Sequence, residues 1–193
     1  MAAQSVPFLN EHVHVRKQRT EAGRGTRHRL VVVADSPADL VCAAGGLVYD
    51  RASSGWDVAV FLSACKSDRA LSILGVRWRA LASATLSHMV DLQPDAIVAS
   101  HDLFTKNRRV HRFIRATSRH RTEIALWGGA AWPTELDKGL GQVEHRLSRA
   151  ALAFKPYAIE AAGVPAPWES SDVETFHSSK RRFEVAANLE PRR

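Results

Sequence analysis

The sequence predicts a single α/β domain of the Rossmann-like, doubly wound type, in which helices flank a mostly parallel sheet. Three observations carry this prediction. The length of 193 residues suits one domain. Short runs of β-branched and apolar residues recur along the chain, and they alternate with segments whose apolar residues follow a helical period. Residues 29–193 are expected to form this domain, after a basic, flexible N-terminal arm over residues 1–28.

The domain is expected to open with a buried strand at residues 29–34. Its sequence, RLVVVA, is apolar on both faces, as central parallel strands are. A turn follows, in which Pro37 favours extended geometry at Ser36. A helix is expected from Asp39 to about Ala52, because a carboxylate near a helix N-terminus interacts favourably with the helix dipole.

The remaining elements follow from the same patterns. Apolar runs predict further strands at 56–64, 93–100 and 122–127. Helical spacing of apolar residues predicts helices at 67–74, 77–92, 109–118 and 140–155. The first of these helices would be capped by Ser67 or Asp68 and stopped by Gly75. Loops are expected after residue 102 and over 128–139, and an irregular tail would end in a short element around 176–187.

The composition is that of a soluble globular protein, with 45% apolar and 24% charged residues. No run approaches the ~18–20 apolar residues of a membrane helix, and the N-terminus lacks the pattern of a signal peptide. Cys42 and Cys65 are too few for a disulfide framework, and both lie in apolar runs. They are expected to be buried free thiols, which predicts a cytoplasmic protein.

The formal net charge of +7 favours anionic partners, which range from phosphosugars to nucleic acid. Basic residues gather in segments 12–29 and 107–121 and at the C-terminus. Aromatic interleaving, zinc-finger spacing and a helix-turn-helix pattern are all missing from the sequence. Nucleic-acid binding therefore stays an alternative to a small anionic ligand, and the oligomeric state stays open.

Polar residues follow several of the predicted strands at their carboxyl ends. They include Asp35, Asp39, Ser63 and the pair His101 and Asp102. Ligands of doubly wound sheets bind beyond the carboxyl ends of the strands. A binding site is therefore expected at this edge of the sheet.

The first strand, turn and helix resemble those of the PIG-L/LmbE-like family of zinc-dependent de-N-acetylases. In that family the first strand ends in Ala-His-Pro-Asp-Asp-Glu, and Gly-Gly follows in the helix. The stretch ADSPADLVCAAGG keeps Pro37, Asp39, Gly45 and Gly46 at the same spacing. The resemblance implies a Rossmann-like fold and a lineage that removes N-acetyl groups from N-acetylglucosaminyl-type substrates.

Later segments extend the resemblance to roughly residues 29–160. SGWDVAVFLSA is similar to the second strand of the family, LQPDAIVASHD to a later strand, and SRAALAFKPYAIE to a helix. The His-Pro-Asp-His element of the family falls on Arg108-Arg109-Val110-His111. Each motif is weak alone, and their order along the chain makes the resemblance specific.

The resemblance implies a metal site of which two ligands remain. In the family the His and second Asp of the turn and the second His of the later element hold zinc. Those positions are Ser36, Asp39 and His111 in this sequence, so Asp39 and His111 are the retained candidate metal ligands. Catalytic zinc sites use three protein ligands, and two ligands would hold zinc weakly or not at all.

The catalytic groups that the family uses are replaced. The general-base Asp of the turn is Ala38, and the position that stabilises developing charge or donates a proton is Arg108. Loss of a general base costs about 10²–10⁴-fold in rate. The resemblance therefore implies a deacetylase-type protein that is impaired in catalysis, a pseudoenzyme, with a residual pocket for a sugar-type or anionic ligand. Ser36, Asp35, His101 and Arg108 are the candidate ligand-binding residues.

Other interpretations stay open. A rearranged metal set of Asp35, Asp39, His101 and His111 would make an active metal-dependent amide hydrolase, although a one-residue shift turns Asp35 toward the opposite face of an extended segment. The chain could also be a basic protein that binds nucleic acid or an acidic partner, or a non-catalytic subunit of an active relative. The plainest interpretation of Asp39 is the N-cap or a first-turn carboxylate of a helix.

Overall fold

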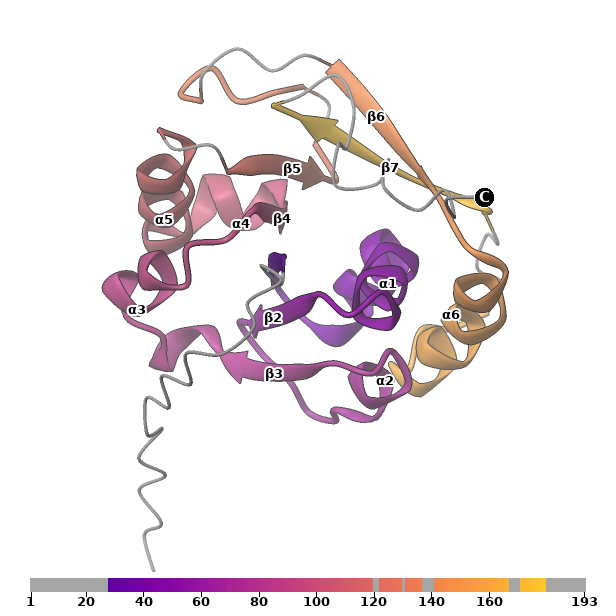
Figure 1. The fold of residues 1–193 in the computed structure, drawn as a ribbon. Helices are drawn as coiled ribbons and strands as arrows, with labels where there is room; N and C mark the ends of the chain where they lie inside the picture. Colours follow the sequence, from indigo (N-terminus) through magenta and orange to yellow (C-terminus); the bar gives the residue numbers. More distant parts are fainter. Residues whose placement is uncertain (1–27, 120–121, 130, 137–140, 167–170, 180–193) are drawn as a thin grey trace, which may run out of the picture.

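A mixed β-sheet runs through the middle of the molecule, and helices cover both of its faces (Figure 1). The computed structural model describes residues 28–119, 122–129, 131–136, 141–166 and 171–179. The strands are β1 (Arg29–Ala34), β2 (Asp57–Leu62), β3 (Arg77–Ala80), β4 (Ala96–Ser100), β5 (Glu123–Trp127), β6 (Gly141–Arg146) and β7 (Val173–Ser178). The helices are α1 (Pro37–Ser53), α2 (Arg69–Ile73), α3 (Leu86–Asp91), α4 (His101–Lys106), α5 (Arg108–Ser118) and α6 (Arg149–Ala161), with a 3₁₀ turn at Leu81–Ser83.

The strand order is β3-β2-β1-β4-β5-β7-β6. The first five strands of this order pair in parallel, whereas β7 is antiparallel to both β5 and β6. The chain moves from β1 to one side for β2 and β3, and to the other side for β4 and β5. The switch point of the topology therefore lies between β1 and β4, where such sheets bind ligands. The predicted Rossmann-like class with a mostly parallel sheet is confirmed.

Two apolar cores form on the two faces of the sheet. Successive residues of β1 alternate between them: Leu30, Val32 and Ala34 face one core, and Val31 and Val33 face the other. This alternation explains why β1 is apolar throughout. Helices α1, α2 and α6 cover the first face, and α3, α4 and α5 cover the second.

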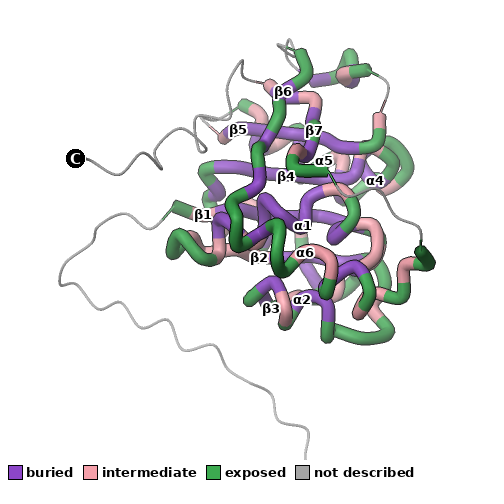
Figure 2. Tube along the Cα trace, turned by 90° about the vertical axis from the view of Figure 1, so that its right-hand side faces the viewer, coloured by how far each residue is buried: buried purple, intermediate pink, exposed green. Residues whose placement is uncertain are grey.

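Burial is highest in the central strands. Figure 2 shows β1 and β4 as buried tubes, with exposed segments on the outer sides of the helices. None of the helices in the described ranges has the length and apolar character needed to cross a membrane. The predicted burial of both thiols is wrong, because Cys42 is exposed and Cys65 is only half-buried, although both are free.

Several predicted elements match the structure closely. The strand at residues 29–34 coincides with β1, and the predicted strands at 56–64, 93–100 and 122–127 contain β2, β4 and β5. The predicted helices at 67–74 and 109–118 correspond to α2 and α5. Gly75 follows α2 with a φ of +73°, as a helix-stopping glycine does.

The helix predicted over residues 77–92 is wrong in its first half. Residues Arg77–Ala80 form β3 and pair with β2, with Arg77 opposite Ala59. Only Leu86–Asp91 is helical, after Thr85, whose side chain accepts a hydrogen bond from the backbone N–H of His88. The four residues of β3 alternate between exposed and half-buried, which is the period of a strand.

Two further predictions fail for related reasons. The loop expected after residue 102 is helix α4, which begins at His101. The helix expected over 140–155 is strand β6 followed by α6, and β6 has the strand alternation, with Val143 and His145 buried between exposed neighbours. Ser148 caps α6 with its side chain. The last strand, β7, begins three residues before the short element predicted from Phe176. Residues 1–27 of the predicted arm and 180–187 of the last element lie outside the described residues.

Candidate functional site

The turn after β1 is built as a helix cap. Ser36 is the N-cap residue of α1, and its Oγ accepts a hydrogen bond of 3.2 Å from the backbone N–H of Asp39. Pro37 occupies the first turn, where its missing N–H costs nothing. The helix therefore starts two residues earlier than predicted, and Asp39 lies in its first turn.

The carboxylate of Asp39 is held by two N–H groups. Its Oδ1 accepts from the indole Nε1 of Trp127 at 3.0 Å, and its Oδ2 accepts from the backbone N–H of Asp35 at 3.0 Å. Trp127 is the last residue of β5 and is only 5% exposed. The carboxylate thus joins the carboxyl end of β1 to that of β5.

A cleft of about 640 Å³ opens at this edge of the sheet. It lies at the carboxyl ends of β1, β2, β4 and β5, as the strand order predicts for a doubly wound sheet. Its lining is Asp35, Asp39, Ser63, Ser100, Asp102, Leu103, Lys106, Asn107, Trp127 and Gly128. Both its size and its mixture of polar and apolar groups suit a small organic ligand.

A second cleft of about 550 Å³ adjoins the first, and the two share Ser63, Lys106 and Asn107. Leu81, Ala82, Arg108 and Arg109 complete the lining of the second cleft. Since three residues line both clefts, the two clefts are adjacent, and together they are called the groove.

Two contacts set the electrostatics of the groove. Lys106 donates a hydrogen bond to Asp102 at 2.7 Å, and this contact holds the pKa of the exposed Asp102 carboxyl below its ordinary value. Asn107 caps α5, because its Oδ1 accepts from the backbone N–H groups of Arg109 and Val110. Two of the three shared residues, Lys106 and Asn107, therefore already have partners within the protein.

Three of the six predicted site residues line the groove. Asp35 and Asp39 line the first cleft, and Arg108 lines the second. Ser36 lies between the two carboxylates in sequence and caps α1. The edge at which the sequence placed the site is thus the edge where the structure has its groove.

The two predicted histidines are not among the residues that line either cleft. The ring of His101 lies against Gly129, where a Cβ would come within 2.5 Å of it. The ring of His111, half-buried on α5, lies 4.9 Å from the ring of Phe104. Both rings are engaged in packing beside the groove.

The side chains present do not fit a catalytic zinc ion. Across the described residues, no group of three or more His, Cys, Asp and Glu side chains is arranged to hold a metal. Asp39, the retained ligand position of the turn, already accepts one N–H on each oxygen. A catalytic zinc ion needs three protein ligands, and the described side chains do not supply that set.

Several lining residues were not predicted from the sequence, including Trp127, Ser100, Lys106 and Asn107. Two of them could have been found, since Trp127 and Ser100 are the last residues of their strands. Lys106 and Asn107 were missed because α4 was expected to be a loop.

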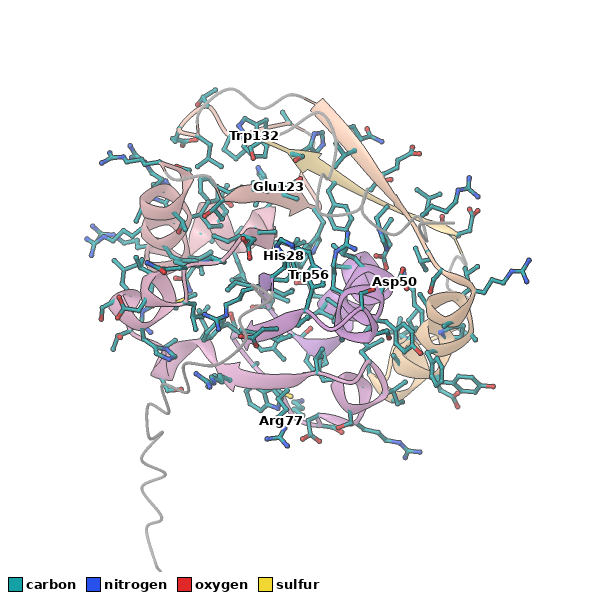
Figure 3. All side chains as sticks on the ribbon, viewed as in Figure 1. His28, Asp50, Trp56, Arg77, Glu123 and Trp132 are labelled. Carbon is teal, nitrogen blue, oxygen red and sulfur yellow. The ribbon has the colours of Figure 1, made fainter. Side chains whose placement is uncertain are left out.

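A buried cluster elsewhere has the residue types of a catalytic triad without its geometry. Asp50 of α1, which lies on the side of that helix facing α6 (Figure 3), accepts from the Oγ and the backbone N–H of Ser148 and is 2.9 Å from Nε2 of His145. Ser148 is thus bonded to the acid and not to the histidine. A triad nucleophile must be bonded to its base, so this cluster joins α1, β6 and α6 and is not a nucleophilic site.

No protein-family model and no curated protein matches the chain. Several solved structures, however, are similar to it in fold. A zinc-inhibited form of teicoplanin deacetylase is 10% identical and covers 78% of this chain and 97% of its own, with a TM-score of 0.54. A40926 pseudoaglycone deacetylase is 14% identical and covers 78% and 96%, with a TM-score of 0.51.

N,N'-diacetylchitobiose deacetylase from Pyrococcus horikoshii is 13% identical and covers 79% of this chain and 84% of its own, with a TM-score of 0.50. These structures are deacetylases of the LmbE/PIG-L type. At such identities the likeness concerns the fold. The chain therefore shares its fold with deacetylases of the PIG-L/LmbE type.

Proposed function

We propose that this chain is a PIG-L/LmbE-type protein that is impaired in zinc-dependent de-N-acetylation and binds a small sugar-type or anionic ligand in its groove. The shared fold with solved deacetylases supports the lineage. Two of those proteins are named for substrates or products that contain sugars, teicoplanin and diacetylchitobiose. The groove lies at the switch point of the sheet, which is where such folds bind ligands.

The hydrogen bonding of the Asp39 carboxylate is the observation that supports the proposal most strongly. Its two oxygens accept the indole N–H of Trp127 and the backbone N–H of Asp35. A carboxylate held in this way serves as a structural acceptor. The neighbouring ligand position holds Ser36, whose oxygen is used to cap α1, so the turn offers Asp39 no second ligand for zinc.

The groups that remain are suited to binding. The carboxylates of Asp35 and Asp102 can accept hydrogen bonds from sugar hydroxyls, and Lys106 and Asn107 can donate to ligand oxygens. No general base stands at position 38, which is alanine. These residues therefore bind and orient a ligand, and none of them is placed to activate water on a metal.

The experiment combines activity with binding in the full chain. N-acetylglucosamine and N,N'-diacetylchitobiose are incubated with the protein at graded zinc concentrations, and released acetate is measured. In parallel, the indole N–H resonance of Trp127 is followed by NMR and assigned with Trp127→Phe. We expect ligand-dependent shifts of this resonance and no more acetate than Asp39→Asn releases.

Other results would favour the alternatives. Zinc-dependent acetate release that Asp39→Asn abolishes would support an active hydrolase with the rearranged set of Asp35, Asp39, His101 and His111. Absence of any sugar binding, together with steeply salt-dependent binding of nucleic acid, would support the basic binding protein. A cytoplasmic location stays a prediction from the free thiols.

A further inference from the structure

The groove has two lobes of opposite charge, which are the first and the second cleft described above. The first lobe carries the carboxylates of Asp35, Asp39 and Asp102, whereas the second carries the guanidinium groups of Arg108 and Arg109. Among the described residues that line the second lobe there is no Asp or Glu. The groove therefore presents acceptors at one end and cations at the other.

The first lobe is unsuited to an anion. Asp39 is occupied by its two N–H donors, and Asp102 is paired with Lys106 at 2.7 Å, so the only cation among the described residues that line this lobe is already neutralised. The carboxylate of Asp35 is exposed there. A ligand group in this lobe is favoured when it donates hydrogen bonds to carboxylates, as hydroxyl groups do.

The two arginines of the second lobe differ in what they already bind. Arg109 donates from Nη1 to the backbone carbonyls of Leu81, Ala82 and Ala84, and these bonds fix the segment after β3 against α5. Arg108 is exposed, and its side chain makes no ion pair or hydrogen bond with the described part of the chain. Arg108 is therefore the cation available to a ligand on a wall that Arg109 fixes.

We propose that the natural ligand of the groove is a sugar-type molecule that also carries a phosphate or carboxylate group. Its sugar part lies in the first lobe, and Arg108 binds its anionic group in the second lobe. This proposal rests on the proposed function, since it refines the ligand of the same groove. Arginine binds anionic oxygens in a forked, bidentate geometry, which a lysine cannot reproduce. Repulsion by the carboxylates of the first lobe fixes which end of the ligand enters which lobe.

The test compares ligands that differ in one group. Dissociation constants of N-acetylglucosamine, its 1-phosphate, its 6-phosphate and inorganic phosphate are measured by calorimetry on the full chain at fixed ionic strength. We expect at least one phosphosugar to bind about tenfold or more tightly than the neutral sugar, as one charge-assisted contact provides. Inorganic phosphate should compete with the phosphosugar and leave the binding of the neutral sugar unchanged.

Matched variants assign the effect to one residue. Arg108→Ala should bring the affinity for the phosphosugar down to that for the neutral sugar, and Arg108→Lys should recover only part of the difference. Arg112→Ala is the control, because Arg112 is exposed one turn further along α5 and lines neither lobe. It should leave both affinities unchanged.

The outcomes separate this inference from the proposed function. Equal binding of neutral and phosphorylated sugars to the parent protein overturns the two-lobe inference and leaves the sugar-binding function standing. An equal loss in Arg108→Ala and Arg112→Ala also overturns it, because the preference would then come from net charge alone. If none of the sugars or phosphate binds, both the inference and the proposed function are wrong.

Discussion

The indole Nε1 of Trp127 lies 3.0 Å from Oδ1 of Asp39 and donates a hydrogen bond to it. The two residues stand at the ends of β5 and β1, and β4 lies between these strands in the sheet. The bond therefore crosses the carboxyl end of β4, beside the floor of the groove. It makes Asp39, a position that resembles a metal ligand of the family, also a part of the framework of the site.

Removal of the indole N–H tests this relationship through stability. Trp127→Phe is expected to lower the free energy of unfolding by about 1–2 kcal/mol, because a hydrogen bond to a charged acceptor is lost and Asp39 is only half-buried. Urea denaturation measures the change. A double-mutant cycle with Asp39→Ala should show a coupling of about 1 kcal/mol, and strictly additive effects would mean that the two side chains do not interact.

The double glycine of α1 provides a matched pair of variants. A Cβ on Gly46 would lie 2.4 Å from Cγ of the buried Leu147, whereas a Cβ on Gly45 would meet nothing closer than 3.5 Å. Gly46→Ala is therefore expected to destabilise the protein by about 1–3 kcal/mol through overpacking. Gly45→Ala should be neutral or stabilising by up to about 1 kcal/mol, since alanine favours the helix. Equal thermal midpoints for the two variants would contradict this packing.

A buried ion pair clamps the middle of α1. Glu174 accepts from the backbone N–H groups of Gly46 and Leu47 and from Nζ of Lys155, at 2.7–2.8 Å. Because Glu174 is only 4% exposed, Glu174→Ala leaves the largely buried ammonium of Lys155 without its charge partner and should cost about 3–5 kcal/mol.

The exposed pair of Arg146 and Asp172, also 2.7 Å apart, is the control for that clamp. Asp172→Asn should change the free energy of unfolding by less than about 1 kcal/mol, as surface ion pairs do. Chemical denaturation of both variants decides between a buried clamp and an incidental contact. Similar small losses in the two would show that Glu174 is not the clamp.

Asp50 should contribute to the loss of folding stability at acid pH. Burial raises the pKa of its carboxyl, but hydrogen bonds from His145 and Ser148 outweigh burial and bring the pKa below its ordinary value of 3.8. A depressed pKa in the folded state stabilises the fold above pH 3.8, and that stability is lost as the pH falls through the folded pKa.

Unfolding free energies measured against pH test this contribution. Asp50→Asn should be less stable than the parent near neutral pH, and the difference should shrink below about pH 4. Asp102→Asn is the comparison, because Asp102 is exposed and its pair with Lys106 should add little. A difference for Asp50→Asn that stays constant down to the lowest pH would contradict this role.

The elements that sequence alone predicted well are those with unambiguous periodicity. The apolar run of β1 and the amphipathic pattern of α5 each allowed one interpretation. Residues 77–92 allowed two, because Trp78, Leu81, Thr85, Met89 and Leu92 have helical spacing while the short strand β3 alternates within it. Four residues carry too little periodicity to outweigh a longer pattern, and the pairing of β3 with β2 decides its structure.

The residues of the site also divide into those that the sequence could predict and those that it could not. The rule that ligands bind at strand ends located Asp35, Asp39 and the edge of the groove. His101 is not among the lining residues, because α4 begins at that residue and its ring lies against Gly129, whereas Asp102 lines the groove. The bond between Trp127 and Asp39 joins residues 88 positions apart, so no local sequence pattern could predict it.

Zinc content per chain distinguishes Asp39 as a structural acceptor from Asp39 as a metal ligand. The full chain is loaded with zinc, dialysed and analysed, beside Asp39→Asn and His111→Ala. A double variant, His12→Ala with His14→Ala, is the control for zinc bound by histidines of the N-terminal arm. We expect well under one retained zinc per chain, with no further loss in Asp39→Asn or His111→Ala. One retained zinc per chain that both of these variants lose, and that the arm control keeps, would contradict this expectation.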